Sequence, residues 1–189
     1  GIIIMIVTRI EEADKSKVKI YVDGEYAFPF YQKDIGKYRL EEGKEISQEI
    51  YDTIMEETIL YRAKEKAMSL LKFSDRTEAE LRGKLKSAGF PDRIVSFVLD
   101  YVCSYGYIND ERYAASYVNM KMESKSRAFI RMELLHRGIK KELIDKVLSE
   151  EYEKEEEDPE IKAIRKLVLK KYSDPDAISG EAANKLLAS

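Results

Sequence analysis

The pattern of apolar and polar positions changes from strand-like to helical along this chain. Residues 3–10 are rich in Ile and Val, and residues 17–22 alternate between polar and apolar side chains, as a half-buried strand does. Asp23 and Gly24 follow as a two-residue turn signal, because both positions of a type I′ turn need positive φ. Residues 25–30 then complete a hairpin. We expect a small antiparallel sheet of two or three strands, with Pro29 on an edge strand because it cannot donate to a ladder.

After a loop, apolar residues recur every three or four positions, which is the period of amphipathic helices. Ser47 can cap a helix that begins near Gln48, and Asn109 can cap another. Thr77 and Glu80 have the spacing of a capping box, in which each side chain satisfies a free backbone N–H group. Gly89, Gly106 and Gly138 follow apolar stripes and indicate helix ends. The helices expected after residue 59 are near 60–72, 77–88 and 91–104, several within 109–150, and two near 159–171 and 176–188.

The helical part repeats itself after 49 residues. Leu81 falls on Ile130 and Gly89 on Gly138, and the apolar stripes on either side of the glycine recur in register. One unit is therefore three helices, and a third unit has only its first two. The sequence predicts a mainly α protein, an elongated array of tandem three-helix repeats after an N-terminal β-hairpin or small sheet. The predicted parts are the hairpin and loop (1–46), the first repeat with its leading helix (47–106), the second repeat (107–152) and the incomplete third repeat (153–189).

Composition narrows the function classes. The chain of 189 residues has one cysteine, Cys103, and one histidine, His136. A single cysteine cannot form an intramolecular disulfide, so we expect a reducing, cytoplasmic setting and place Cys103 in the core. Such scarcity disfavours zinc sites and histidine-based catalysis, and no phosphate-binding or metalloprotease motif is present. We expect a monomeric protein without catalytic residues, metal or cofactor, and no membrane segment, because no apolar run is long enough.

Charge is uneven along the chain although the net charge is only −3. Residues 150–160 hold eight acids against Lys154, whereas residues 121–141 and 62–86 are rich in Lys and Arg. Basic helices can contact phosphates or acidic protein surfaces, but they can equally be ordinary solvated faces. Arg127 and Arg131 are one helical turn apart, which favours a real patch. The candidate binding residues are Lys121, Lys125, Arg127, Arg131, Arg137, Lys140 and Lys141, followed by Arg76, Arg82, Lys84 and Lys86.

Three stretches together resemble a known family, the RecX regulators of the RecA recombinase. They are residues 74–85 (SDRTEAELRGKL), 106–114 (GYINDERYA) and 130–139 (IRMELLHRGI). Each stretch alone could simply mark helix starts and ends, but the order and spacing of the three stretches together are specific to the family. The Asp23-Gly24 hairpin is similar to the N-terminal extension of the longer family members. The resemblance covers nearly the whole chain.

The resemblance implies a non-enzymatic regulator in DNA repair, homologous recombination and the SOS response. Such proteins bind the RecA–DNA filament along its groove and most often restrain its recombinase, ATPase and coprotease activities. The resemblance implies RecA as the partner and single- or double-stranded DNA as a further contact. Two other functions fit the residues: a stand-alone nucleic-acid-binding protein built from helical modules, and a structural adaptor for an unrelated protein. An enzyme has no positive support in the sequence.

Overall fold

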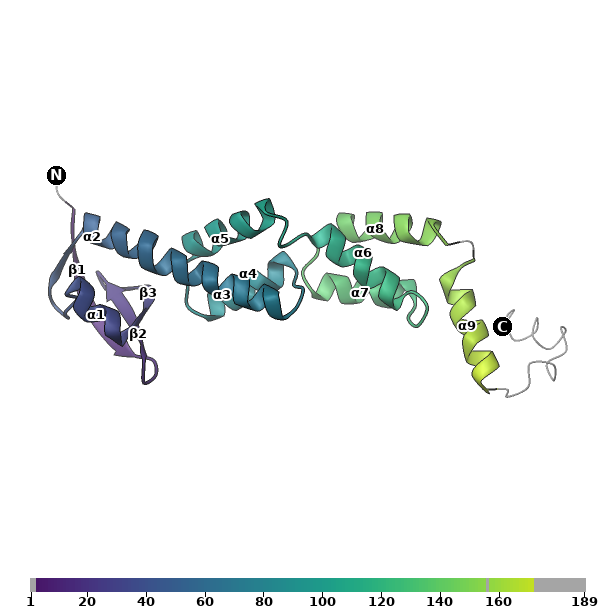
Figure 1. Cartoon of the computed structure of the whole chain (residues 1–189), viewed down its shortest axis with the longest axis horizontal. Helices are drawn as coiled ribbons and strands as arrows, with labels where there is room; N and C mark the ends of the chain where they lie inside the picture. The colour runs from purple at the N-terminus through teal and green to yellow at the C-terminus, as the bar shows by residue number, and fades with distance from the viewer. Residues whose placement is uncertain (1–2, 156, 172–189) are drawn as a thin grey trace. The chain divides into compact units, whose positions relative to one another are not determined.

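The computed structural model describes residues 3–155 and 157–171. The chain divides into two compact units, residues 1–108 and 109–189 (Figure 1), and each unit has its own hydrophobic core. Within the described residues, none of the helices combines the length and apolar character that a bilayer span requires. The expectation of a mainly helical protein with an N-terminal antiparallel sheet is confirmed.

The first unit begins with a four-stranded antiparallel sheet. Its strands β1 (Ile4–Glu12), β2 (Lys17–Val22), β3 (Glu25–Tyr31) and β4 (Glu45–Ser47) lie in the order β3-β2-β1-β4. Asp23 and Gly24 join β2 to β3 with φ values of 50° and 82°, so the predicted turn is confirmed. Pro29 lies on β3 and pairs with Lys19 of β2, and β3 is an edge strand as expected.

The sheet differs from the prediction in one strand and one helix. The sequence predicts two or three strands, but β4 pairs with β1 through Ile4–Ser47, Met5–Ile46 and Ile6–Glu45. Three residues are too few to show an alternating pattern, so this strand has no signal of its own. The segment expected to be a loop contains α1 (Gln32–Tyr38), which ends at Arg39 in the left-handed conformation.

One long helical segment follows the sheet and shares its core. It consists of α2 (Gln48–Thr53), the π-helical segment η1 (Ile54–Ile59) and α3 (Leu60–Phe73). Ser47 caps its start by accepting from the backbone N–H of Ile50, as predicted. The π segment buries Ile54, Met55 and Ile59. Figure 1 shows the strands gathered beside the N-terminal part of this segment.

Helices α4 (Glu78–Ser87) and α5 (Asp92–Ser104) complete the first three-helix repeat. The capping box of Thr77 and Glu80 is present, and Thr77 is fully buried. Leu81 and Leu85 of α4 pack into the same core as the sheet residues Phe28 and Phe30. The sheet and the first repeat are therefore one packed body.

The second unit repeats this arrangement with α6 (Asp110–Lys121), α7 (Arg127–His136) and α8 (Lys141–Glu153). Asn109 and Ser126 cap α6 and α7 through their side chains. Gly89, Gly106 and Gly138, which follow α4, α5 and α7, have φ values of 90°, 72° and 83°. These positive angles explain why glycine stands at each predicted helix end.

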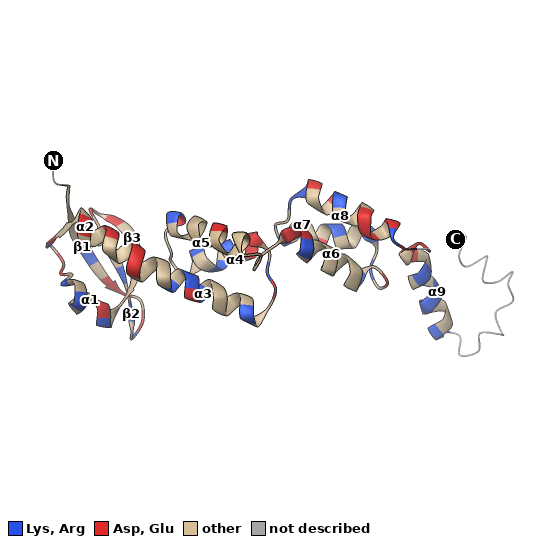
Figure 2. Cartoon of the chain, turned by 45° about the horizontal axis from the view of Figure 1, so that its top comes forward, with Lys and Arg blue, Asp and Glu red and all other residues tan. Residues whose placement is uncertain are grey.

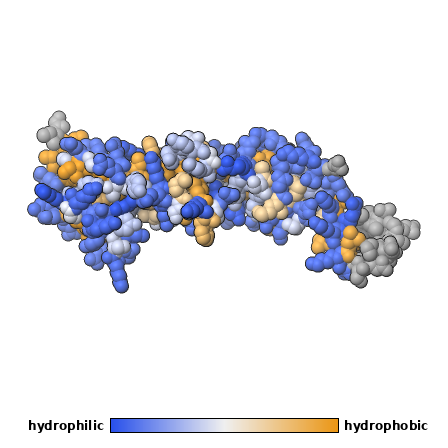
Figure 3. Space-filling view, in the orientation of Figure 1, coloured by the Kyte–Doolittle hydropathy of each residue, from blue (hydrophilic) through white to orange (hydrophobic). Residues whose placement is uncertain are grey.

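Helix α9 (Pro159–Lys171) is the first helix of the predicted third repeat. The Asp158 side chain accepts from the backbone N–H of Glu160, which confirms the predicted cap. Ile161, Ile164, Leu167 and Leu169 of α9 are 44–68% exposed, and apolar surface reaches the outside there (Figure 3). The helix expected near 176–188 lies outside the described residues.

One buried-residue prediction is wrong. Cys103 is exposed rather than part of the core, although it follows Leu99 by one turn. The α5 face that is buried carries Val95, Val98 and Val102, and Cys103 lies one position beyond that stripe.

Candidate functional site

Within the second unit, the predicted basic residues do not all lie on one face. Figure 2 shows basic and acidic positions interspersed along the helices of both units. In the second unit, Arg127 and Arg131 lie against α8, whereas Arg137 lies against α6. The three arginines therefore point to two different sides of α7.

Arg131 is held in an ion pair within the second unit. Its Nε lies 2.7 Å from Asp145 Oδ1 and its Nη2 lies 3.4 Å from Asp145 Oδ2. Because Arg131 donates these hydrogen bonds, the pKa of Asp145 is lowered and that of Arg131 is raised. A guanidinium that already satisfies a carboxylate has fewer donors left for a partner.

Arg127 and Arg137 pack on tyrosine rings of their own unit. The Arg127 guanidinium lies 5.1 Å from the ring centre of Tyr152 on α8. The Arg137 guanidinium lies 5.4 Å from the ring centre of Tyr117, whose hydroxyl donates to Glu133 at 3.0 Å. These cation–π contacts help to join the three helices.

The lysines of the second unit are more available. Lys140 and Lys141 are exposed at the N-terminal end of α8, and Lys121 is half-buried at the end of α6. Among the residues that the structure describes, none of these three forms an ion pair. Lys125 is exposed and lies 5.0 Å from the ring of Phe129.

In the first unit too, some of the predicted basic residues form ion pairs and others do not. Arg82 pairs with Glu78 at 3.4 Å and Lys86 with Asp92 at 3.2 Å, while Lys84 is exposed and has no ion pair within the described chain. Arg76 is half-buried beside α4, and its Nε is buried. Of the predicted basic residues in the described part of the chain, the lysines that form no internal ion pair are Lys84, Lys121, Lys125, Lys140 and Lys141.

Two features of the first unit were missed by the sequence analysis. Phe97 and Tyr101 of α5 and Tyr105 directly after it follow one another at four-residue spacing, and the ring centres of Tyr101 and Tyr105 are 4.8 Å apart. The Lys64 ammonium lies 4.4 Å from the Tyr101 ring centre. The four-residue spacing of these aromatic residues in the sequence is the signal that could have predicted their alignment.

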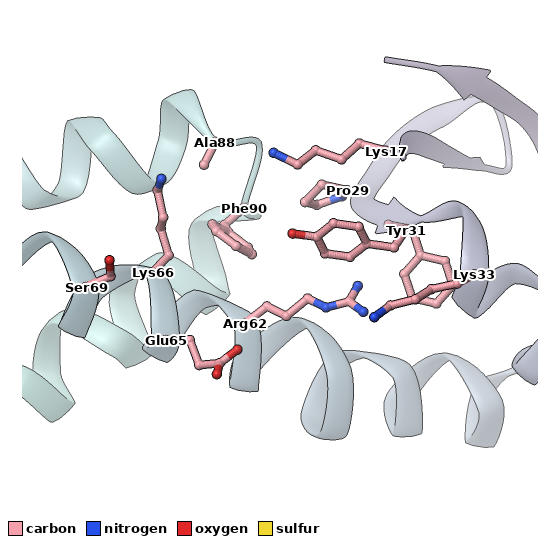
Figure 4. Close-up of a pocket in the computed structure, with 11 residues that line it drawn as sticks. Lys17, Pro29, Tyr31, Lys33, Arg62, Glu65, Lys66, Ser69, Ala88 and Phe90 are labelled. Atoms are coloured by element: carbon pink, nitrogen blue, oxygen red, sulfur yellow. The ribbon is translucent and has the colours of Figure 1, made fainter. Parts of the chain in front are cut away.

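The second missed feature is a cavity of about 680 Å³ between the sheet, α3 and the turn after α4 (Figure 4). Its cations come from segments far apart in the chain, so no local pattern predicts it. Within residues 3–155 and 157–171, no group of three or more His, Cys, Asp or Glu side chains could hold a metal ion.

Comparison with known proteins assigns the chain to a family. Three domain families match in order along the chain: the RecX N-terminal domain at residues 5–47, the first RecX three-helix domain at 63–101 and the second at 109–148. The chain belongs to the RecX family. RecX proteins are non-enzymatic regulators, and the predicted resemblance is confirmed.

Relatives match over most of this chain. Regulatory protein RecX of Caldanaerobacter subterraneus is 40% identical over 169 residues, which cover 88% of this chain and 84% of that protein. Regulatory protein RecX of Clostridium acetobutylicum is 31% identical, and the match covers 89% of this chain and 78% of that protein.

Solved RecX structures agree with the fold. A crystal structure of regulatory protein RecX is 26% identical with a TM-score of 0.55, and covers 97% of this chain and 90% of its own. RecX from Lactobacillus salivarius is 22% identical with a TM-score of 0.52, covers 68% of this chain and 82% of its own, and supports the fold alone.

Proposed function

We propose that this RecX protein binds the RecA–DNA filament along its groove and restrains its recombinase, ATPase and coprotease activities. The observation that carries the proposal is the ordered match of three RecX domain families within residues 5–148. The protein would act as a monomer in the cytoplasm, and DNA in the filament is a second contact.

The exposed lysines support this function through their charge. Lys84 on α4, Lys141 on α8 and Lys140 directly before α8 belong to the two three-helix repeats, and they form no ion pair among the described residues. They can therefore approach acidic protein surfaces or phosphates without breaking an internal ion pair. Many weak contacts of this kind give an affinity that falls as the salt concentration rises.

Only basic residues that have no internal partner can be substituted to test the proposal without disturbing the fold. Removing Arg131 would leave Asp145 without its partner, so a loss of binding could reflect a disturbed domain. Lys140 and Lys141 stand at the start of α8, where acidic residues favour the helix dipole. The double substitution Lys140→Glu/Lys141→Glu therefore reverses charge at a helix start, where the helix dipole favours acids.

The test is binding of the full chain to preformed RecA–single-stranded-DNA–ATP filaments, with DNA-only and RecA-only controls and ATP hydrolysis measured in parallel. We expect filament-dependent binding and slower hydrolysis, with Lys140→Glu/Lys141→Glu at least about tenfold weaker if each lysine contributes about 0.7 kcal/mol. Lys15→Glu/Lys72→Glu makes the same charge change at two exposed lysines that are not candidate binding residues and form no ion pair within the described chain.

The controls separate the alternatives. Equal binding to naked DNA would favour the stand-alone nucleic-acid-binding function, and no binding to filament or DNA would refute both. Equal losses in the two double variants would refute the role of the α8 lysines, because net charge alone would then explain the effect.

A further inference from the structure

A cationic and aromatic cavity lies within the first unit, apart from the helices of the second. Its walls come from the start of β2, the end of β3, the first turn of α1, one side of α3 and the turn between α4 and α5. Figure 4 shows Tyr31 and Phe90 pointing toward each other across it, with Lys17 on one side and Arg62 on the other. Lys33, Lys66 and Pro29 also line the cavity.

The wall of the cavity is held in place by specific contacts. The Tyr26 hydroxyl donates to the carbonyl oxygen of Gly89 at 2.6 Å and so ties β3 to the turn that carries Ala88 and Phe90. Arg62 of α3 forms an ion pair with Asp34 of α1, and its guanidinium lies 4.1 Å from the Tyr31 ring centre. The Tyr31 ring and the turn around Phe90 are therefore positioned before any ligand arrives.

The excess of positive charge around the cavity favours an anionic ligand. Four cationic side chains line it against one carboxylate, Glu65. In the described part of the chain, Lys17, Lys33 and Lys66 form no ion pair, and Arg62 Nη1 is buried with no hydrogen-bond partner. Because Arg62 is already paired with Asp34, an anionic group that enters the cavity would gain mainly from the three unpaired lysines.

The apolar walls narrow the chemistry of that anion. Phe90, Pro29 and the part of the Tyr31 ring that Arg62 leaves uncovered offer apolar surface beside the lysines. A carboxylate of an acidic peptide would use the charge and leave these surfaces uncovered, whereas a nucleotide joins a phosphate to a planar base. A volume of about 680 Å³ is within the usual range for small-ligand pockets.

We propose that this cavity binds a nucleotide, with its phosphate on Lys17, Lys33 and Lys66 and its base against Tyr31 and Phe90. The nucleotide has two sources, a single DNA strand or a free nucleotide, and both present the same phosphate and base. This site goes beyond filament binding, because it needs no RecA.

The experiment measures binding of a fluorescein-labelled oligothymidylate to the full chain by anisotropy, in the absence of RecA. Lys17→Gln/Lys66→Gln removes two phosphate contacts at exposed positions and should weaken binding about tenfold, since hydrogen bonds to charged groups are the stronger class. It should also reduce the salt slope, by about 0.7 for the phosphate that loses its lysine contacts. Lys15→Gln/Lys72→Gln, which changes two exposed lysines outside the cavity, is the matched control.

A second variant tests the aromatic wall. Phe90→Leu keeps the half-buried position apolar but removes the ring, and should weaken binding at least about fivefold because base–aromatic stacking is lost. Circular dichroism and thermal unfolding of each variant check that the first unit is intact. Unlabelled ATP added as competitor distinguishes the two sources: displacement indicates a free-nucleotide site and no displacement a strand site, and both support the proposal.

The proposal fails if the cavity and control double variants lose the same affinity, or if Phe90→Leu in a folded chain binds as tightly as the parent. It also fails if polyglutamate displaces the oligonucleotide as effectively as unlabelled oligothymidylate, because the cavity would then be selecting charge alone. None of these results affects the filament test at Lys140 and Lys141, so the two proposals fail separately.

Discussion

Gly89 is the position where one added methyl group tests how the sheet is joined to the first repeat. Its φ is +90°, and a Cβ built there would lie 2.6 Å from Tyr26 Oη, the atom that donates to the Gly89 carbonyl. Gly106 has a similar φ of +72°, but a Cβ there has nothing within 4 Å. Gly89→Ala and Gly106→Ala therefore share a backbone cost and differ in the contact with Tyr26.

The expected loss in free energy of unfolding differs between the two glycine variants. Left-handed backbone costs a non-glycine residue about 1–2 kcal/mol, and the reduced freedom of the unfolded chain returns about 0.4–1 kcal/mol, so Gly106→Ala should lower the free energy of unfolding by about 1 kcal/mol. Gly89→Ala also displaces the Tyr26 hydroxyl and loses its hydrogen bond, so its total should be about 2–3 kcal/mol. Burial raises the pKa of Tyr26 to about 12, so the hydroxyl stays a donor at neutral pH.

Tyr26→Phe completes a double-mutant cycle. Once the hydroxyl is gone, the nearest remaining neighbours of a Cβ added at Gly89 are Pro29 Cβ and the ring carbon Cζ of residue 26, both at an ordinary 3.7 Å. Gly89→Ala should therefore cost only about 1 kcal/mol in the Tyr26→Phe background, a coupling of about 1–2 kcal/mol.

The assay is native-state hydrogen exchange of β2 and β3 amides, which reports on the first unit without contribution from the second. The reasoning is refuted if the two glycine variants are equally destabilised, or if Gly89→Ala and Tyr26→Phe are additive within about 0.3–0.5 kcal/mol.

Three further predictions concern caps, core and pH. Thr77→Ala should lower the free energy of unfolding by about 1–2 kcal/mol, because it removes the fully buried capping side chain of α4; thermal unfolding measures this, and an unchanged midpoint would contradict it. Leu134→Ala should cost about 2–5 kcal/mol because Leu134 is fully buried, whereas the neighbouring Leu135→Ala, at a 39% exposed position, should cost far less; equal losses in urea unfolding would contradict the assigned core. Hydrogen bonds from Lys166 and Lys162 lower the pKa of Glu123 from 4.5 to about 2, so the ion pairs that attach α9 are complete above pH 4.5 and are lost as pH falls toward 2. Protease cleavage in α9 should rise over that interval, and Glu123→Gln should remove the pH dependence while raising cleavage at pH 7.

Features that depend on neighbours in the chain were predictable. The Asp23-Gly24 turn, the capping box at Thr77 and the glycine after α7 were all identified because turns and helix ends are decided by a few adjacent residues. The 49-residue repeat was visible for the same reason, since each repeat needs an apolar stripe of its own to bury. The three stretches that resemble the family consist largely of these helix caps, helix ends and apolar stripes.

Features that depend on distant partners needed the tertiary structure. Strand β4 exists because β1 offers it a ladder, and not because Glu45–Ser47 has a pattern. Arg131 was predicted as a binding residue from its charge, but folding brings Asp145 to it from the next helix.

The candidate nucleotide cavity is the clearest case of this dependence. Lys17 and Lys66 come from β2 and α3, and only the packing of the sheet on the helix places both on one cavity. The sequence by itself determined where helices, turns and repeats occur, because those follow from short-range periodicity and backbone preference. Only the tertiary structure decided which charges are neutralised and which remain available, because a side chain's partner depends on packing between residues far apart in the chain.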